Sequence, residues 1–188
     1  LCHRRERVSF VGGGEPDAEA VVFTPDGRFV ATERDGSHGS TSKPEILRFD
    51  AASTASTLQA TAEWNLTSDL PSLPANDGPE GISWIPDSFL TARGLRDEHT
   101  GAPYDPAAYP GHGSGLFFAG VEDNGTVYAY ALNLSGGGYT RVATFAGGLP
   151  SVMELEFDPA TGHLWAVCDD NCQGRSSTLD INAQGQFA

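Results

Sequence analysis

Acidic residues recur in a fixed pattern along this chain, and they are the side chains whose spacing most clearly suggests chemistry. A glutamate lies near the start of each of three short apolar segments, and the apolar segment that follows each of these runs into further acidic residues. Carboxylate oxygens are hard ligands, and without sulfur or clustered imidazole they suit Ca²⁺ or Mg²⁺. With calcium as the expected ion, the candidate metal ligands are Glu19, Glu80, Glu122, Asp123, Glu154, Asp169 and Asp170.

The same residues have a second interpretation, in which Asp and Asn beside turns simply make Asx turns and solvated loop ends. The sequence contains no contiguous EF-hand loop of the D-x-[DN]-x-[DN]-G type, so a cation site would have to be assembled from separate segments. Like charges held close together raise one another's pKa values unless a cation compensates them. The pattern therefore points to a cation site only if the fold brings the carboxylates together.

Other catalytic templates are absent from the sequence. It has no G-x-S-x-G elbow, no H-E-x-x-H helix and no G-x-x-x-x-G-K-[ST] loop. A stretch rich in Gly, Pro and Tyr at residues 87–115 contains Asp97, Glu98 and His99, which would be the acid/base candidates of a hydrolase. This stretch is either a lid or binding loop, or an ordinary surface excursion.

The elements that must position these carboxylates are short strands in a repeat. Three segments align on a proline two residues after an aromatic side chain, at residues 19–25, 80–86 and 153–159. Two of them continue through turn residues, Asp26-Gly27 and Ala160-Thr161-Gly162, into a second apolar strand, which predicts β-hairpins. Third strands are expected at 45–50, 126–134 and 176–181, and fourth strands at 58–65 and 139–145, with a further fourth strand opening the chain near Arg7.

Four-stranded repeats of this length predict an all-β chain built as a β-propeller segment of about three antiparallel blades. Three blades cannot close a ring, so either the polypeptide continues beyond these residues or two copies combine into a six-bladed ring; Leu1 and an unpaired Cys2 favour the first. The expected buried aromatic residues between neighbouring sheets are Phe23, Trp84, Phe157 and Trp165. The expected blades are residues 6–50, with the fourth strand first, 58–134, with an insertion at 87–115, and 139–188.

A propeller places the start of each first strand and the end of each second strand at one rim of the central channel. In this chain those positions hold Glu19 with Glu33 and Asp35, Glu80 with Glu122 and Asp123, and Glu154 with Asp169 and Asp170. The repeat therefore predicts a ring of carboxylates at the channel mouth.

Composition narrows the classes of partner. Asp and Glu number 25 against 11 Lys and Arg, for a formal net charge of -14, which argues against nucleic acid because phosphate binding needs a basic patch. No apolar run approaches the roughly 20 residues of a transmembrane helix, so membrane insertion is not expected. The remaining partner classes are another protein, a glycan, or the rest of the chain's own propeller.

Cysteines and glycosylation sequons favour an oxidising, extracellular setting. Cys168 and Cys172 are four residues apart, a spacing that can close a small disulfide loop; a pair of free thiols is the alternative. Three N-x-[ST] triplets are candidate glycosylation sites, at Asn65, Asn124 and Asn133. A secreted or cell-surface protein is expected.

Two stretches carry a resemblance to a known family. Residues 76–84 and 154–169 resemble the esterase-like phytase propellers and the related SdiA-regulated proteins, and more distantly the gluconolactonase-type six-bladed propellers. By this resemblance Glu80 matches a metal-ligand glutamate at the rim, and Glu122 and Asp169 match the acidic ends of second strands. The insertion after Pro86 departs from the pattern.

Two functions follow as hypotheses. The first is a secreted or cell-surface propeller that serves as a binding or assembly module, with a structural calcium ion at the channel rim. The second is a calcium-dependent hydrolase, phytase-like or lactonase-like, in which the metal activates water. A phytase-type site should also offer several basic side chains for phosphates, whereas only Arg34, Arg93 and Arg96 are expected near the rim. That shortage favours the binding module.

Overall fold

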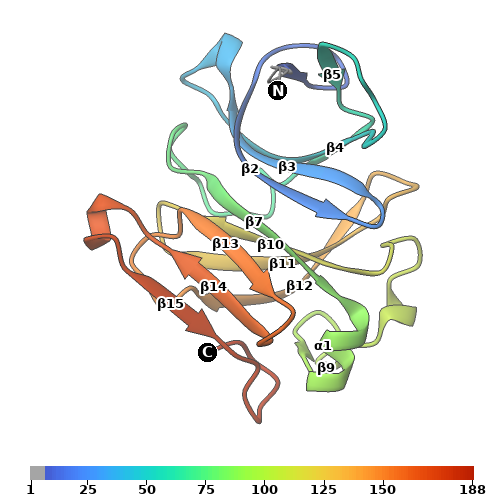
Figure 1. Ribbon diagram of the computed structural model, residues 1–188, viewed down its shortest axis with the longest axis vertical. Coiled ribbons are helices and arrows are strands. Elements are labelled where there is room, and N and C mark those ends of the chain that lie inside the picture. The colour runs from blue at the N-terminus through green and yellow to red at the C-terminus, as the bar shows by residue number, and fades with distance from the viewer. Residues whose placement is uncertain (1–6) are drawn as a thin grey trace.

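The computed structural model describes residues 7–188 and is built mainly from three antiparallel sheets (Figure 1). Strands account for 47 % of the described residues and helices for 9 %, so the predicted all-β class is confirmed. Cys2 lies outside the described residues. Among the described residues, no helix is long and apolar enough to cross a membrane.

Each sheet is a meander of strands in chain order. The first sheet is β2 (Pro16–Thr24), β3 (Gly27–Asp35), β4 (Ser42–Phe49) and β6 (Ala62–Asn65). The second sheet is β7 (Pro79–Pro86), β10 (Gly115–Val121), β11 (Thr126–Leu132) and β12 (Tyr139–Ala146). The third sheet is β13 (Glu154–Asp158), β14 (His163–Val167) and β15 (Ser176–Leu179).

Smaller elements connect or cover these sheets. β1 (Arg7–Ser9) pairs in parallel with β5 (Thr57–Gln59), and β8 (Arg96–Asp97) pairs with β9 (Ala102–Pro103). The helices are α1 (Asp87–Arg93) and three single 3₁₀ turns, η1 (Gly36–His38), η2 (Pro106–Ala108) and η3 (Asp170–Cys172). The longest helix therefore has only seven residues.

Both predicted hairpins form. β2 pairs with β3 and β13 with β14, across turns in which Gly27 and Gly162 have φ values of +141° and +80°. Only glycine adopts such values without strain, which explains its place in both turns.

The predicted grouping of fourth strands is wrong. β6 pairs with β4 and β12 pairs with β11, so each fourth strand completes the sheet whose third strand it follows. β1, expected as a fourth strand, instead pairs with β5 outside the first sheet, and the third sheet has three strands within the described residues. Sequence spacing shows that a strand exists but not which neighbour it bonds, which explains the error.

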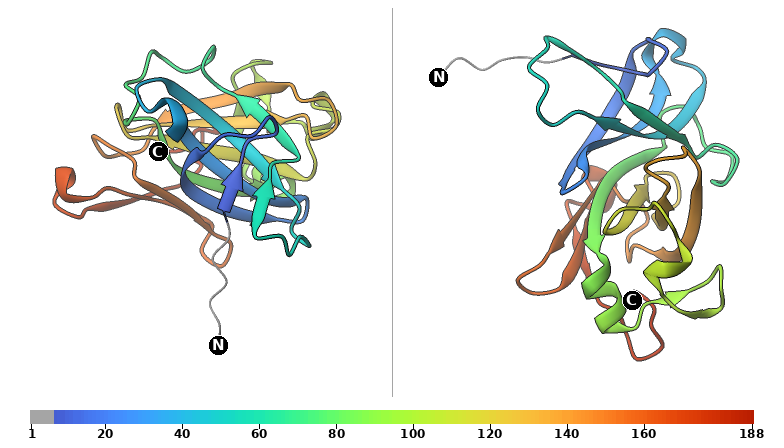
Figure 2. Two further views of the ribbon diagram at one scale, coloured as in Figure 1. Left: turned by 90° about the horizontal axis from the view of Figure 1, so that it is seen from above. Right: turned by 90° about the vertical axis from the view of Figure 1, so that its right-hand side faces the viewer.

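The three sheets pack face to face, with the second in the middle. Phe29, Ile46 and Trp64 of the first sheet share one core with Phe117 and Tyr130 of the second. The opposite face of the second sheet forms another core with the third sheet, in which the third-sheet members are Leu155, Phe157, Leu164, Ala166 and Leu179. β7 is the strand of the second sheet that contacts both β2 and β13. Figure 2 shows the stack from two further sides.

Two of the four expected interior aromatic residues are not interior. Phe157 is 7 % exposed and Trp84 packs partly buried against the first core, but Phe23 is 70 % exposed and Trp165 is 39 % exposed. Ala20 and Val22 of β2 face the second sheet, so Phe23 points the other way, and Trp165 alternates in the same manner with the buried Leu164 and Ala166.

Gly81 allows the second and third sheets to approach at the start of β7. A Cβ placed on Gly81 would lie 2.8 Å from the backbone nitrogen of Leu155 and 2.9 Å from the carbonyl carbon of Glu154. We expect Gly81→Ala to lower the free energy of unfolding by about 1–3 kcal/mol, because backbone atoms cannot rotate aside as a side chain can. Urea unfolding measures this.

Gly138→Ala is the matched control. No heavy atom lies within 4 Å of a Cβ placed there, and its φ is not in the left-handed region. This variant should be neutral or more stable by a few tenths of a kcal/mol. An equal loss in both variants would contradict the close approach of the two sheets.

Candidate metal centre

The carboxylates meet at the edge where β2 and β7 begin and β3 and β10 end. Glu19 and Glu80 lie near the starts of β2 and β7, while Glu33 lies near the end of β3 and Glu122 directly follows β10. Antiparallel pairing brings these ends together: Pro16 is opposite Asp35, and Pro79 is opposite Val121. The pairing of β2 with β3 has register shifts between Pro16 and Ala20, so Asp17 and Glu19 do not follow regular strand alternation.

We name the resulting group the carboxylate cluster: Asp17, Glu19, Glu33, Glu80 and Glu122. It contains two sets of three, Asp17 with Glu19 and Glu33, and Glu33 with Glu80 and Glu122. In each set one oxygen of every residue lies within 4.8 Å of the others. Oxygens on opposite sides of a calcium ion, at about 2.4 Å each, are about 4.8 Å apart. The oxygens are therefore close enough to share an ion.

Glu33 is the buried centre of the cluster and belongs to both sets. It is 2 % exposed, and one of its oxygens accepts a 3.3 Å hydrogen bond from the backbone N–H of Gly78. The segment around Gly78 is fixed in turn, because its carbonyl accepts a 2.9 Å hydrogen bond from the N–H of Glu122. A Cβ on Gly78 would lie 2.6 Å from the Cβ of Glu33, so this position needs glycine.

The carboxylates raise one another's pKa values. Burial, together with the charges of Glu19, Glu33 and Glu122, raises the pKa of Glu80 to about 8. Burial raises the pKa of Glu33 to about 7, although the hydrogen bond from Gly78 opposes the shift. The pKa values of Glu19 and Glu122 are also raised, mainly by burial and then by neighbouring acids. Without an ion, this cluster holds protons near neutral pH.

Arg34 is the cation that ion-pairs with the cluster. Its Nε lies 2.6 Å from an oxygen of Asp17, and its guanidinium is 4.0 Å from Glu33. One guanidinium cannot neutralise five carboxylates, so the cluster keeps an excess of negative charge that favours a divalent cation.

The predicted ligands divide into two groups. Glu19, Glu80 and Glu122 are brought together in the carboxylate cluster. The oxygens of Asp123, Glu154, Asp169 and Asp170 belong to neither set of three among residues 7–188. Asp169 instead accepts a hydrogen bond from the N–H of Asn171 at the start of η3, although its charge still contributes to the raised pKa of Glu122.

Asp17 and Glu33 were not in the predicted ligand set. The repeat could have identified Glu33 as a ligand, because Glu33 occupies the same place in the first repeat as Glu122 does in the next. The sequence indicates Asp17 more weakly, through its position two residues before Glu19 on the same strand. Only the register shifts in β2 bring both residues to Glu33.

The insertion lies at the opposite end of β7 from Glu80, not beside the carboxylates. It starts at Asp87, directly after β7 ends, and Figure 1 shows α1 at that far end. Asp97 is 0 % exposed, and its carboxylate accepts hydrogen bonds from the hydroxyl of Tyr109 and the N–H groups of His99 and Thr100. The acid/base candidates Asp97, Glu98 and His99 are thus remote from the cluster, and Asp97 holds the loop together.

A largely buried polar network holds the insertion together where it leaves β7. The hydroxyl of Tyr104 donates to Asp87 at 2.8 Å, and Nε2 of His112 lies 3.0 Å from the other oxygen of Asp87. Burial and Asp87 raise the pKa of Tyr104. Leu90, Leu95, Tyr104 and Tyr109 belong to the core between the second and third sheets. The insertion is therefore a packed part of the fold.

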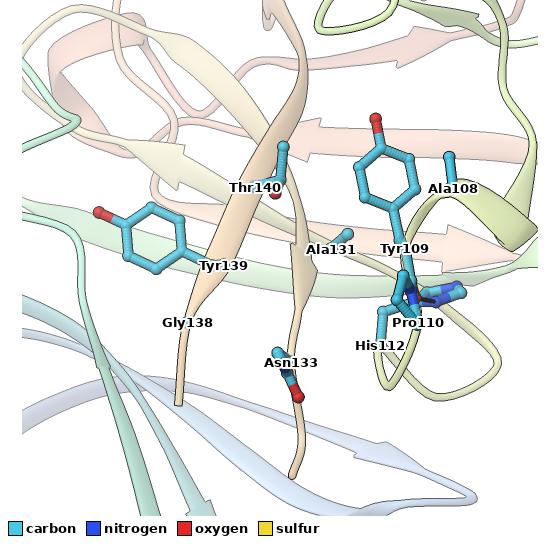
Figure 3. A pocket seen from close by; sticks show the side chains of 9 residues that line it. All are labelled: Ala108, Tyr109, Pro110, His112, Ala131, Asn133, Gly138, Tyr139 and Thr140. Carbon is cyan, nitrogen blue, oxygen red and sulfur yellow. Dashed lines mark hydrogen bonds between the residues drawn. The ribbon is translucent and has the colours of Figure 1, made fainter. Parts of the chain in front are cut away.

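A cavity of about 290 Å³ lies between the insertion and β12 (Figure 3). Tyr109 and Tyr139 stand on opposite sides of it, with Thr140, Ala131 and Asn133 between them. The hydroxyl of Tyr109 is already bonded to Asp97. The cavity is separate from the carboxylate cluster and shares no residue with it.

No protein-family model matches the chain, and no curated protein matches it.

Proposed function

We propose that the chain is a β-propeller segment that binds a calcium ion through the carboxylate cluster and serves as a secreted or cell-surface binding and assembly module. The observation that carries this proposal is that Glu33, a buried carboxylate, lies within 4.8 Å of four other carboxylates contributed by two sheets. An ion bound there would tie the first sheet to the second. Two four-stranded meanders and one three-stranded meander, with β2, β7 and β13 in neighbouring inner positions, support the propeller.

The donor set fits calcium better than a transition metal. It consists of carboxylates alone, and Ca²⁺ takes 6–8 oxygen ligands at about 2.3–2.6 Å in flexible geometry. Neither set of three includes a histidine or cysteine, the ligands that zinc and copper select. An ion would also replace the protons that Glu33 and Glu80 hold near neutral pH, so binding should release protons and strengthen as pH rises.

Calorimetric titration with CaCl₂ tests the proposal. We expect one site in the wild-type chain, and proton release revealed by repeating the titration in buffers of different ionisation enthalpy. Glu80→Gln should weaken binding at least about tenfold, or 1.4 kcal/mol. Glu154→Gln, at the same place in the third sheet but outside both sets of three, should leave the affinity unchanged. Absence of calcium binding by the wild-type chain would refute the proposal.

A calcium-dependent hydrolase is the second candidate, and the exposure of the cluster favours it. Glu33 is buried, Glu80 and Glu122 are partly buried and Glu19 is exposed, so an ion bound there would have one side open to water. Such a water could be activated by the metal. Calcium-dependent release of product from phytate, an activated ester or a lactone, lost in Glu80→Gln, would favour this candidate over a binding module.

The extracellular setting is supported by the cysteine pair and by one sequon. Cys168 and Cys172 lie at disulfide-bonding distance, with Cα atoms 5.6 Å apart and both side chains buried. Asn124 is exposed in the turn between β10 and β11. Asn133 is half-buried, and its side-chain oxygen accepts hydrogen bonds from Ser135 and Gly136.

We expect a glycan at Asn124 when the chain is secreted from a eukaryotic cell. Exposed Asn65, whose side chain donates a 2.6 Å hydrogen bond to Glu45, is the next candidate. Intact mass before and after removal of N-linked glycans measures the modification, and Asn124→Gln should remove most of the mass difference. A secreted product with the mass of the bare polypeptide would contradict this expectation.

A further inference from the structure

The exposed large hydrophobic side chains of the described residues gather mainly on the two outer faces of the stack of sheets. Trp165 and Val167, each 39 % exposed, lie on the face of the third sheet that points away from the second. Val21 and Phe23, 56 % and 70 % exposed, lie on the face of the first sheet that points away from the second. Figure 1 shows these sheets at the two ends of the stack. Such side chains mark contact surfaces.

The two faces have opposite roles in the stack: one is of the type that packs against the next sheet, and the other is of the type that packs against the preceding sheet. The free face of the third sheet corresponds to the faces that the first and second sheets bury against the sheet that follows them. The free face of the first sheet corresponds to the face that the second sheet packs against the first, and to the face that the third sheet packs against the second. A third-sheet face meeting a first-sheet face would therefore continue the packing already seen twice in the chain.

Charges of opposite sign lie beside the exposed apolar side chains of the two faces. On the third sheet, Glu154 is opposite Val167 and Glu156 is opposite Trp165, and both glutamates are exposed. On the first sheet, Arg28 is opposite Phe23, so its cationic side chain lies on the free face, where the guanidinium donates to the carbonyls of Asp50 and Ala51. Beside its exposed apolar side chains the third-sheet face thus carries two glutamates and the first-sheet face carries Arg28, while Glu45 and Glu63 lie farther out on that face, on β4 and β6.

Among residues 7–188, the strands β1 and β5 and the residues that follow them cover only part of the first face. Phe10, Leu58 and Ala60 pack over Val30, Leu47 and Phe49 of β3 and β4. The exposed side chains are on β2, the innermost strand, and β2 and β13 are the strands through which the end sheets contact β7. The uncovered area is therefore the part of the sheet that neighbouring sheets use.

We propose that a second copy of this chain docks on these faces, third sheet to first sheet at both contacts, and closes a six-sheet ring with two-fold symmetry. Two arcs of three sheets give six, within the range of about four to eight blades that propellers use. A head-to-tail contact that closes after two copies makes a dimer rather than a filament. The inference rests on the proposed propeller and names its assembly partner.

Sedimentation velocity at 10–100 µM chain in 0.15 M NaCl tests the proposal. We expect a species of twice 19.8 kDa. Phe23→Glu and Trp165→Glu should each weaken the dimer at least about 100-fold, because like charge or a buried unpaired charge at a contact costs several kcal/mol. Ala146→Glu, an exposed site on the outermost strand of the second sheet, should leave the dimer intact.

Mixing the two variants gives a result that only this geometry predicts. A mixed dimer has both substitutions at one contact and none at the other, so an equal mixture should recover dimer that neither variant forms alone. A monomer at 100 µM, a dimer insensitive to both substitutions, or no recovery on mixing would overturn the proposal. Far-UV circular dichroism and calcium titration of each variant show whether the fold and the calcium site remain intact, so a failure of assembly is distinguishable from a failure of the proposed cation site.

Discussion

Replacing Glu80 by glutamine is expected to raise the melting temperature of the calcium-free protein at pH 8 and to leave it nearly unchanged at pH 5. The pKa of Glu80 is raised to about 8 in the folded chain, from an ordinary value of 4.5. The stability that its protonated form contributes is present in full below pH 4.5 and is lost as pH rises through 8. Glutamine resembles the protonated carboxyl at every pH, so the variant avoids this loss.

The size of the effect follows from the groups around Glu80. Glu19, Glu33 and Glu122 face it from β2, β3 and the end of β10, and their charges add to burial in raising its pKa. Screening by water reduces what this shift contributes to stability, so we expect roughly 1–2 kcal/mol at pH 8. For a chain of this size that corresponds to about 2–8 °C, measured by differential scanning calorimetry in EGTA.

Calcium should offset the advantage of Glu80→Gln at pH 8. At 100 times its Kd the ion stabilises the wild-type fold by about 2.7 kcal/mol, because it binds only the folded state. Glu80→Gln has one charged ligand fewer and should gain less. The substitution thus stabilises the calcium-free protein and reduces the stabilisation that calcium adds, a pair of opposite effects that a solvated acidic edge would not produce. Glu154→Gln should leave the calcium affinity unchanged, and a fall in that affinity would extend the ligand set to the third sheet.

The repeat made most of this site predictable. Glutamates near the starts of first strands and acids after second strands were expected at one edge, and Glu19, Glu80 and Glu122 do meet there. The third repeat departs from this pattern because the side chain of Asp169 is held at the start of η3. Asp17 reaches the cluster through register shifts in β2, which depend on pairing with β3 and leave no clear mark in the sequence.

The all-β class was predictable from the sequence for a similar reason. The errors in the predicted side-chain and strand positions share one physical cause. Alternation and turn residues reveal strands and hairpins, because both depend on neighbours in sequence. Alternation does not say which face another sheet will cover, so Phe23 and Trp165 were assigned to the interior although they lie on outer faces. The place of β1 and of the fourth strands depended on the same long-range pairing.

Phe117→Ala should cause the largest loss of stability among the variants considered. Phe117 on β10 is 0 % exposed, and its ring centroid lies 4.4 Å from that of Phe29 on β3. Truncating a buried phenylalanine costs about 3–5 kcal/mol, since the removed atoms lose their burial and a cavity remains. The melting temperature should fall by about 10 °C or more. Phe23→Ala, measured at a concentration where the chain is monomeric, should stay within about 0.5 kcal/mol because Phe23 is exposed.

This variant also tests whether sheet packing and the carboxylate cluster depend on each other. Phe29 and Glu33 are on β3, and Glu122 directly follows β10, which carries Phe117, so the core contact helps to hold the two acids at the same edge. At 100 times the wild-type Kd, calcium adds about 2.7 kcal/mol to the wild-type fold, and it should therefore add less to Phe117→Ala. Stabilisation of the same size in Phe117→Ala combined with Glu80→Gln would show that the ion binds elsewhere, because the double variant lacks a central ligand of the proposed site.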